Sequence, residues 1–80
     1  MAFNEKERDT FTFEIIEHVG VISVNSTGWK KELNVVVWNG GSEKYDIRDW
    51  DTNHEHMSRG VTLHKDEAKK LFELLKERKL

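Results

Sequence analysis

The stretch WKKELNVVVWNGGSEKYDIRDW, residues 29–50, decides the fold of this 80-residue chain. Its first half ends in Val35-Val36-Val37-Trp38, and a run so rich in β-branched and aromatic residues favours a strand over a helix. Asn39-Gly40-Gly41-Ser42 follows, and these residues tolerate the positive φ angles of a tight hairpin turn. The chain then returns through Lys44 to Asp51. We therefore predict two antiparallel strands joined by this turn.

The segments on either side of this hairpin carry weaker patterns. Phe11 to Asn25 alternates apolar and polar residues and then becomes a β-branched run, which predicts one long bent strand or two short ones. Gly20 is the residue in this segment suited to a hinge or bulge. Asp51 to Gly60 lacks apolar periodicity and predicts a loop or a poorly formed edge.

The C-terminal segment predicts an amphipathic helix. Ala68, Leu71, Phe72 and Leu75 follow the spacing i, i+3, i+4, i+7, which lines one helical face. Counting the first segment as two strands, the element order is ββββα. We expect an α+β protein, with a curved antiparallel four-stranded sheet followed by one C-terminal helix.

Length and composition limit the classes of protein that fit. The 80 residues allow one small domain, and without cysteine the chain has no disulfide to support a marginal core, so we expect a homodimer. Residues 1–10 are charged with little to bury and predict a flexible N-terminal arm, which leaves residues 11–80 as the domain. Neither a signal peptide nor a run of about 18 apolar residues is visible, so we expect a cytoplasmic protein without membrane contact.

Three tryptophans, at positions 29, 38 and 50, lie on or beside predicted strands and each is near a cation. Lys44, Asp46, Arg48 and Trp50 share one strand face, because side chains alternate. Cations interleaved with tryptophan suit single-stranded nucleic acid, in which phosphates are neutralised and each stacked base contributes about 1–3 kcal/mol. The alternative interpretation is that the rings belong to the core or a dimer interface. The net charge of −2 does not decide between them.

Catalytic and metal chemistry find little support. His54-Glu55-His56 matches no common zinc spacing, and the chain has no cysteine. No nucleophile elbow or phosphate loop is present in the sequence, and so small a fold would hardly enclose a substrate pocket of about 300 Å³. We expect neither an enzyme nor a cofactor.

Several motifs resemble one family over about Phe13 to Arg78. They are Phe13-Glu14-Ile15-Ile16-Glu17, Gly28-Trp29-Lys30-Lys31-Glu32-Leu33-Asn34, Trp38-Asn39, Lys44-Tyr45-Asp46-Ile47-Arg48-Asp49-Trp50 and Gly60-Val61-Thr62-Leu63. With these motifs the chain resembles the YdbC-like bacterial branch of the single-stranded-DNA-binding family typified by the transcriptional coactivator positive cofactor four.

The resemblance implies a ββββα homodimer that holds single strands along its curved sheets and serves transcription or DNA repair. Carried over by position, the stacking aromatics fall on Trp29 and Trp50. The nucleic-acid-binding residues that this resemblance implies are Trp29, Lys30, Lys31, Trp38, Lys44, Arg48, Trp50 and Arg59.

The sequence thus predicts a binding protein for single-stranded DNA with little sequence preference, acting through stacking and phosphate contacts. Single-stranded RNA is an alternative partner, since it offers the same unpaired bases. A protein-interaction module that uses exposed strand edges, without nucleic acid, is the alternative from a different class.

Overall fold

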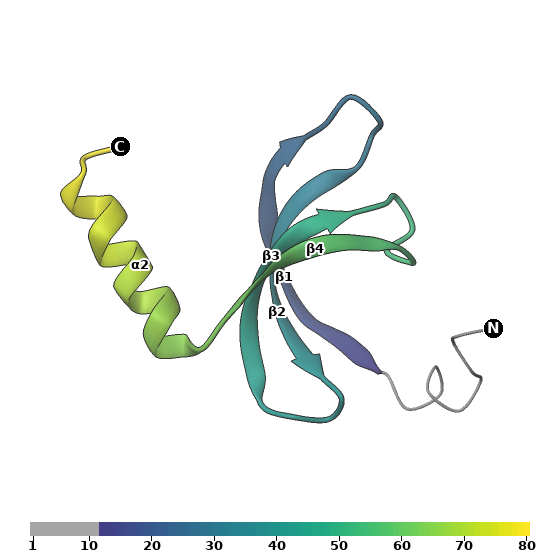
Figure 1. The fold of residues 1–80 in the computed structure, drawn as a ribbon, viewed down its shortest axis with the longest axis horizontal. Helices are drawn as coiled ribbons and strands as arrows, with labels where there is room; N and C mark the ends of the chain where they lie inside the picture. The colour runs from purple at the N-terminus through teal and green to yellow at the C-terminus, as the bar shows by residue number, and fades with distance from the viewer. Residues whose placement is uncertain (1–11) are drawn as a thin grey trace.

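The computed structural model describes residues 12–80 as one antiparallel sheet followed by one helix (Figure 1). The sheet has the order β1-β2-β3-β4. The elements are β1 (Phe13–Val24), β2 (Lys30–Trp38), β3 (Glu43–Trp50), β4 (Met57–Leu63) and α2 (Lys65–Glu77). This arrangement confirms the predicted ββββα order and α+β class, while the predicted arm at residues 1–10 lies outside the described residues.

The strands are divided along the chain differently from the prediction. The first segment forms one strand of 12 residues, β1, whose pairing with β2 shifts register three times, once between His18 and Gly20. The fourth strand is β4, an edge strand whose first residues lie in the segment predicted as a loop or a poorly formed edge. An edge strand pairs on one side only, so Ser58-Arg59-Gly60 forms a strand without apolar alternation.

The central hairpin is confirmed. β2 and β3 pair without a register shift from Lys30 opposite Trp50 to Val37 opposite Glu43. Asn39 (φ 49°) and Gly40 (φ 72°) adopt the positive φ angles that the turn requires.

The uninterrupted register places alternate side chains of β2 and β3 on two faces of the sheet. We call one the network face. On β2 and β3 it comprises Lys30, Glu32, Asn34, Val36, Trp38, Lys44, Asp46, Arg48 and Trp50. It includes the largest fully buried side chains of the described chain: Trp50, Val36, Asn34 and Asp46. Most of the buried core of the protomer therefore lies on this face, although Val35, 8% exposed, lies on the other.

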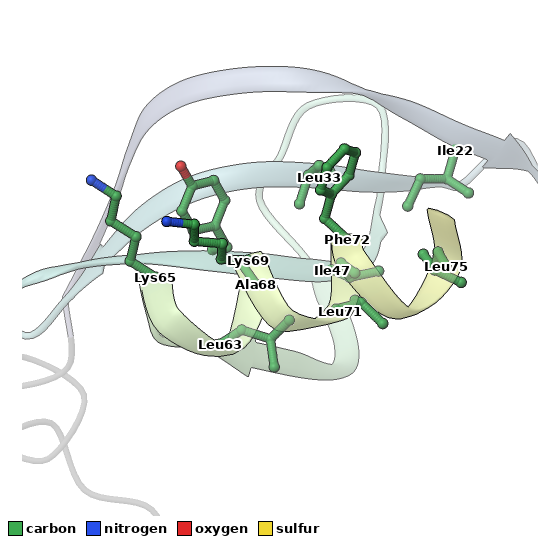
Figure 2. A pocket seen from close by; sticks show the side chains of 11 residues that line it. Ile22, Leu33, Ile47, Leu63, Lys65, Ala68, Lys69, Leu71, Phe72 and Leu75 are labelled. Atoms are coloured by element: carbon green, nitrogen blue, oxygen red, sulfur yellow. The ribbon is translucent and has the colours of Figure 1, made fainter. Parts of the chain in front are cut away.

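We call the other the helix face, where Leu33, Tyr45, Ile47 and Leu63 look toward α2 across an open cavity of about 570 Å³. Figure 2 shows the apolar side chains of α2 and of the strands turned toward this shared space. No residue of α2 is buried, and Phe72 is 62% exposed. The helix therefore stands off the sheet, to one side of it in Figure 1.

Two features of α2 follow from its sequence. Asp66 and Glu67 lie in its first turn and Lys76 in its last, which matches the helix dipole. Glu67 Oε1 also accepts a hydrogen bond from the backbone N–H of His64 at 2.8 Å.

Within the described part of the chain, no helix has the length and apolar character needed to cross a bilayer.

Candidate nucleic-acid interface

Arg48 is the cation that the structure holds most firmly. Its Nε and Nη2 donate to the two carboxylate oxygens of Asp46 at 2.7 and 2.8 Å, and Asp46 is 0% exposed. Thr62 donates a further hydrogen bond to Asp46 at 2.7 Å, and Arg48 Nη1 donates to the Ser58 carbonyl at 3.2 Å. Bidentate pairing fixes the plane of a guanidinium, so Arg48 is oriented before any ligand arrives.

Gly60 makes room for this arrangement. It lies opposite Arg48 in the β3–β4 pairing. A Cβ atom at Gly60 would overlap Arg48 Cβ and the carbonyl oxygen of Ile47. Only glycine at this position lets the Arg48 side chain cross β4 to reach Ser58 and Thr62.

Trp38 and Arg48, both predicted binding residues, are brought together on the network face. The Arg48 guanidinium carbon lies 4.9 Å from the Trp38 ring centroid, within cation–π range. A shallow hollow of about 370 Å³ opens beside them, lined by Trp38, Asn39, Arg48, Met57 and Thr62. The hollow therefore offers a ligand an aromatic surface next to a guanidinium that is fixed in place.

Trp50, the second predicted stacking residue, is placed differently. It is 0% exposed, with its ring 5.4 Å from that of Phe13 and 5.5 Å from that of His54. In this conformation neither side of the ring is open to a base, so Trp50 packs in the core. Trp29, just before β2, is partly exposed.

The predicted lysines divide between the two faces. Lys30 is exposed and pairs across the sheet with Trp50, whereas Lys31 pairs with Asp49 on the opposite face. Lys31 Nζ also forms an ion pair with Asp49 at 3.1 Å. Lys44, on the network face, donates to Ser42 at 3.2 Å. Arg59 is exposed on β4, at an edge of the sheet.

Glu32 forms a second buried polar cluster on the network face, and the sequence analysis missed it. Glu32 is 2% exposed; His54 Nε2 lies 3.0 Å from both of its carboxylate oxygens, and Asn34 Nδ2 donates to it at 3.1 Å. His18 Nδ1 lies 3.5 Å from Glu32 and 2.8 Å from Asn34 Oδ1. The predicted pairing of the two strands could have placed Glu32 on the same face as Arg48, which lies opposite it. Nothing in the local sequence indicates that Glu32 contacts His54.

The pKa of Glu32 reflects two opposing effects. Burial raises it, but hydrogen bonds from Asn34 and His54, with the charges of His54 and His18, outweigh burial and hold the pKa below its ordinary value. Glu32 is therefore a carboxylate at neutral pH. Among residues 12–80, no group of three or more His, Cys, Asp or Glu side chains is arranged to hold a metal ion.

An antiparallel sheet with one C-terminal helix, carrying tryptophan and arginine side chains on one face, is an arrangement that suits a small sheet-based nucleic-acid-binding domain. The chain belongs to the family described as Transcriptional Coactivator p15 (PC4), which matches residues 25–74. It is also similar to an uncharacterized protein of Treponema pallidum (strain Nichols), with 42% identity over 67 residues, covering 84% of this chain and 79% of that protein.

Family membership confirms the resemblance found in the sequence at the level of the family. It supports a nucleic-acid-binding, non-enzymatic protein with a DNA-binding, coactivator-like character. The YdbC-like branch, the homodimer and the individual contact residues stay predictions.

Proposed function

We propose that this protein binds single-stranded DNA with little sequence preference, as a homodimer, in transcription or DNA repair. The observation that carries the proposal is the pairing of Trp38 with Arg48 beside an open hollow on the network face. An aromatic ring next to a guanidinium suits an unpaired nucleotide, because the base stacks on aromatic surface while cations on the same face attract the phosphates. In a duplex the base faces are already stacked on one another.

Trp29 and Trp38 are the stacking residues in this proposal, since both are partly exposed. Lys30, Lys44 and Arg59 supply the charge that follows the phosphates. Arg48 contributes by holding its position against the Trp38 ring more than as a free cation, because Asp46 already pairs with it. Trp50 supports the face from within the core, and Lys31 lies on the other face of the sheet, where it pairs with Asp49.

The homodimer is supported by the helix face. Phe72, Leu75 and Ile22 line its cavity and are 62%, 44% and 55% exposed. Clustered apolar side chains of this kind mark an interaction surface on a small domain. A second copy would cover them and carry a second network face, giving one DNA strand two stretches of binding surface.

Titration of labelled oligo-dT, followed by fluorescence anisotropy, tests the proposal. We expect single strands to bind much more tightly than a duplex of matched length, and log K to fall with log salt by about 0.7 per neutralised phosphate. Equal affinity for duplex and single strand would reject stacking. Competition between matched DNA and RNA oligomers decides which nucleic acid is preferred, and sedimentation decides the oligomeric state.

A further inference from the structure

Two histidines from separate elements converge on the buried carboxylate of Glu32. His18 comes from β1 and His54 from the loop between β3 and β4, and their rings lie 3.5 and 3.0 Å from Glu32 Oε1. Their side chains are 50% and 40% exposed, whereas that of Glu32 is 3% exposed. Each imidazole therefore contacts the carboxylate and also reaches the surface of the network face.

The acceptors fix which ring nitrogen carries the proton. A carboxylate only accepts, so His54 Nε2, 3.0 Å from both Glu32 oxygens, carries a hydrogen. Asn34 donates to Glu32 through Nδ2, so its Oδ1 accepts from His18 Nδ1, which also carries a hydrogen. A further proton on either ring enters at the opposite nitrogen and breaks none of these contacts.

The charge at this place on the network face depends on those protons. With both imidazoles neutral the cluster carries the single negative charge of Glu32, which repels phosphate. One proton brings the cluster to zero and two bring it to a positive charge. Imidazole is the side chain whose unperturbed titration spans this range near neutral pH.

The neighbouring charged groups do not mask this change. Across β3, Arg48 faces Glu32 but is held by Asp46. Across β1, the residue opposite Glu32 is the apolar Val21. Lys30 lies two residues along β2 on the same face and is exposed. In the loop, His56 pairs with Asp51 at 2.9 Å instead of Glu32.

We propose that His18, Glu32 and His54 form a proton-dependent phosphate subsite on the network face, so that single-stranded DNA binding takes up protons. This inference rests on the proposed function. A phosphate near the two rings favours their protonated forms, and by linkage the affinity for single strands rises as pH falls through the imidazole range.

The test is the affinity for oligo-dT between about pH 8 and about pH 6 at constant ionic strength, because neither its bases nor its phosphates titrate there. We expect binding about five- to tenfold tighter at the lower pH, since each proton taken up contributes at most tenfold per pH unit. The double variant His18→Asn/His54→Gln keeps an N–H donor near each original position but gains no proton. It should bind with the same affinity at both pH values.

His56→Gln is the matched control, because His56 sits in the same loop and its partner is Asp51. This variant should retain the full pH dependence. NMR titration of the imidazole Cε1–H signals in the unmodified protein gives a readout that needs no variant. The midpoints of His18 and His54 should rise when oligo-dT is added, and that of His56 should stay in place.

The possible failures are distinct. Tight binding that is independent of pH, or a double variant that keeps the pH dependence, would overturn the subsite and leave the proposed function standing. Unmoved midpoints of His18 and His54 in the bound protein would do the same. Absence of oligo-dT binding at every pH would overturn both proposals.

Discussion

The two sides of this sheet differ in which side chains are buried: polar ones are buried on the network face, and apolar ones of α2 are exposed on the other side. On the network face, Glu32, Asn34 and Asp46 are 2%, 0% and 0% exposed. On the other side, Phe72 and Leu75 of α2, which line the cavity of the helix face, are 62% and 44% exposed. The polar groups are buried because their hydrogen-bond partners lie within the same chain. In this protomer, polar side chains with partners are therefore buried as completely as Val36 and Trp50, while apolar side chains of α2 stay exposed.

The largest effect should come from breaking the network face at Asp46. The Arg48 side chain is 14% exposed, and Asp46→Ala leaves its guanidinium without the opposite charge that now pairs with it. We expect a loss of about 3–5 kcal/mol in the free energy of unfolding, as for other buried pairs that lose one member. Urea denaturation at a fixed protein concentration measures it.

Asp49→Ala is the matched control for Asp46→Ala, because Asp49 pairs with Lys31 on the same two strands, where their side chains are 26% and 46% exposed. Exposed pairs contribute about 0–1 kcal/mol. Similar losses from the two variants would contradict the distinction between the faces.

The next effect concerns the helix face. Phe72→Asp places a charge among the apolar side chains that a second copy would cover, so we expect a dimer to dissociate to about half its mass in sedimentation. The buried area of one aromatic side chain contributes about 2–3 kcal/mol to such an interface. Circular dichroism should show the helix retained, since Phe72 is not part of the protomer core. An unmodified protein that is monomeric at micromolar concentration would refute the proposed role of this face.

A third comparison separates two residues of the network face by how they contact DNA. Trp38→Ala should weaken oligo-dT binding by about 1–3 kcal/mol and leave the salt slope nearly unchanged, because stacking releases few counterions. Lys44→Ala should reduce the slope of log K against log salt by about 0.7. Anisotropy titrations at several salt concentrations measure both. If neither variant changes binding, the hollow beside Trp38 is not part of the interface.

The smallest effect should be in the loop that follows β3. The hydrogen bond to Asp51, together with the charge of Asp51, raises the pKa of His56, and the hydrogen bond to His56 helps lower the pKa of Asp51. The contribution of His56 is present below about pH 6.5 and is lost as pH rises through its folded pKa. The contribution of Asp51 is present above about pH 4 and is lost as pH falls through its own.

The Tm difference between the unmodified protein and His56→Gln should therefore be largest near pH 5 and shrink above about pH 7. It should be small throughout, since the His56 side chain is 73% exposed. A difference that grows toward alkaline pH would contradict the assigned pairing.

Local patterns predicted the elements that depend on local chemistry. The β2–β3 hairpin follows from a β-branched run and a turn of Asn and Gly, and α2 from the spacing of Ala68, Leu71, Phe72 and Leu75. β4 was not separated from its loop, because an edge strand needs no alternation and Ser58-Arg59-Gly60 has none.

The candidate site was predicted only in part, for a different physical reason. Alternation correctly placed Lys44, Arg48 and Trp50 on one face, but it does not say what covers that face. The rings that enclose Trp50 come from Phe13, 37 positions earlier, and from a loop histidine. The pairing of His54 with Glu32 spans 22 positions. Such contacts depend on the completed sheet.

Gly60 affects the register in which β4, the last strand, pairs with β3. β4 has little hydrophobic pattern, and a strand without one is weakly specified and free to slip along its neighbour. Gly60 is the glycine of β4. A shift by one residue would put Arg59 or Val61 where Arg48 now crosses, and either side chain would block it. The absence of a side chain at Gly60 thus leaves space for Arg48 in one register of the β3–β4 pairing. This selects that register for the edge strand.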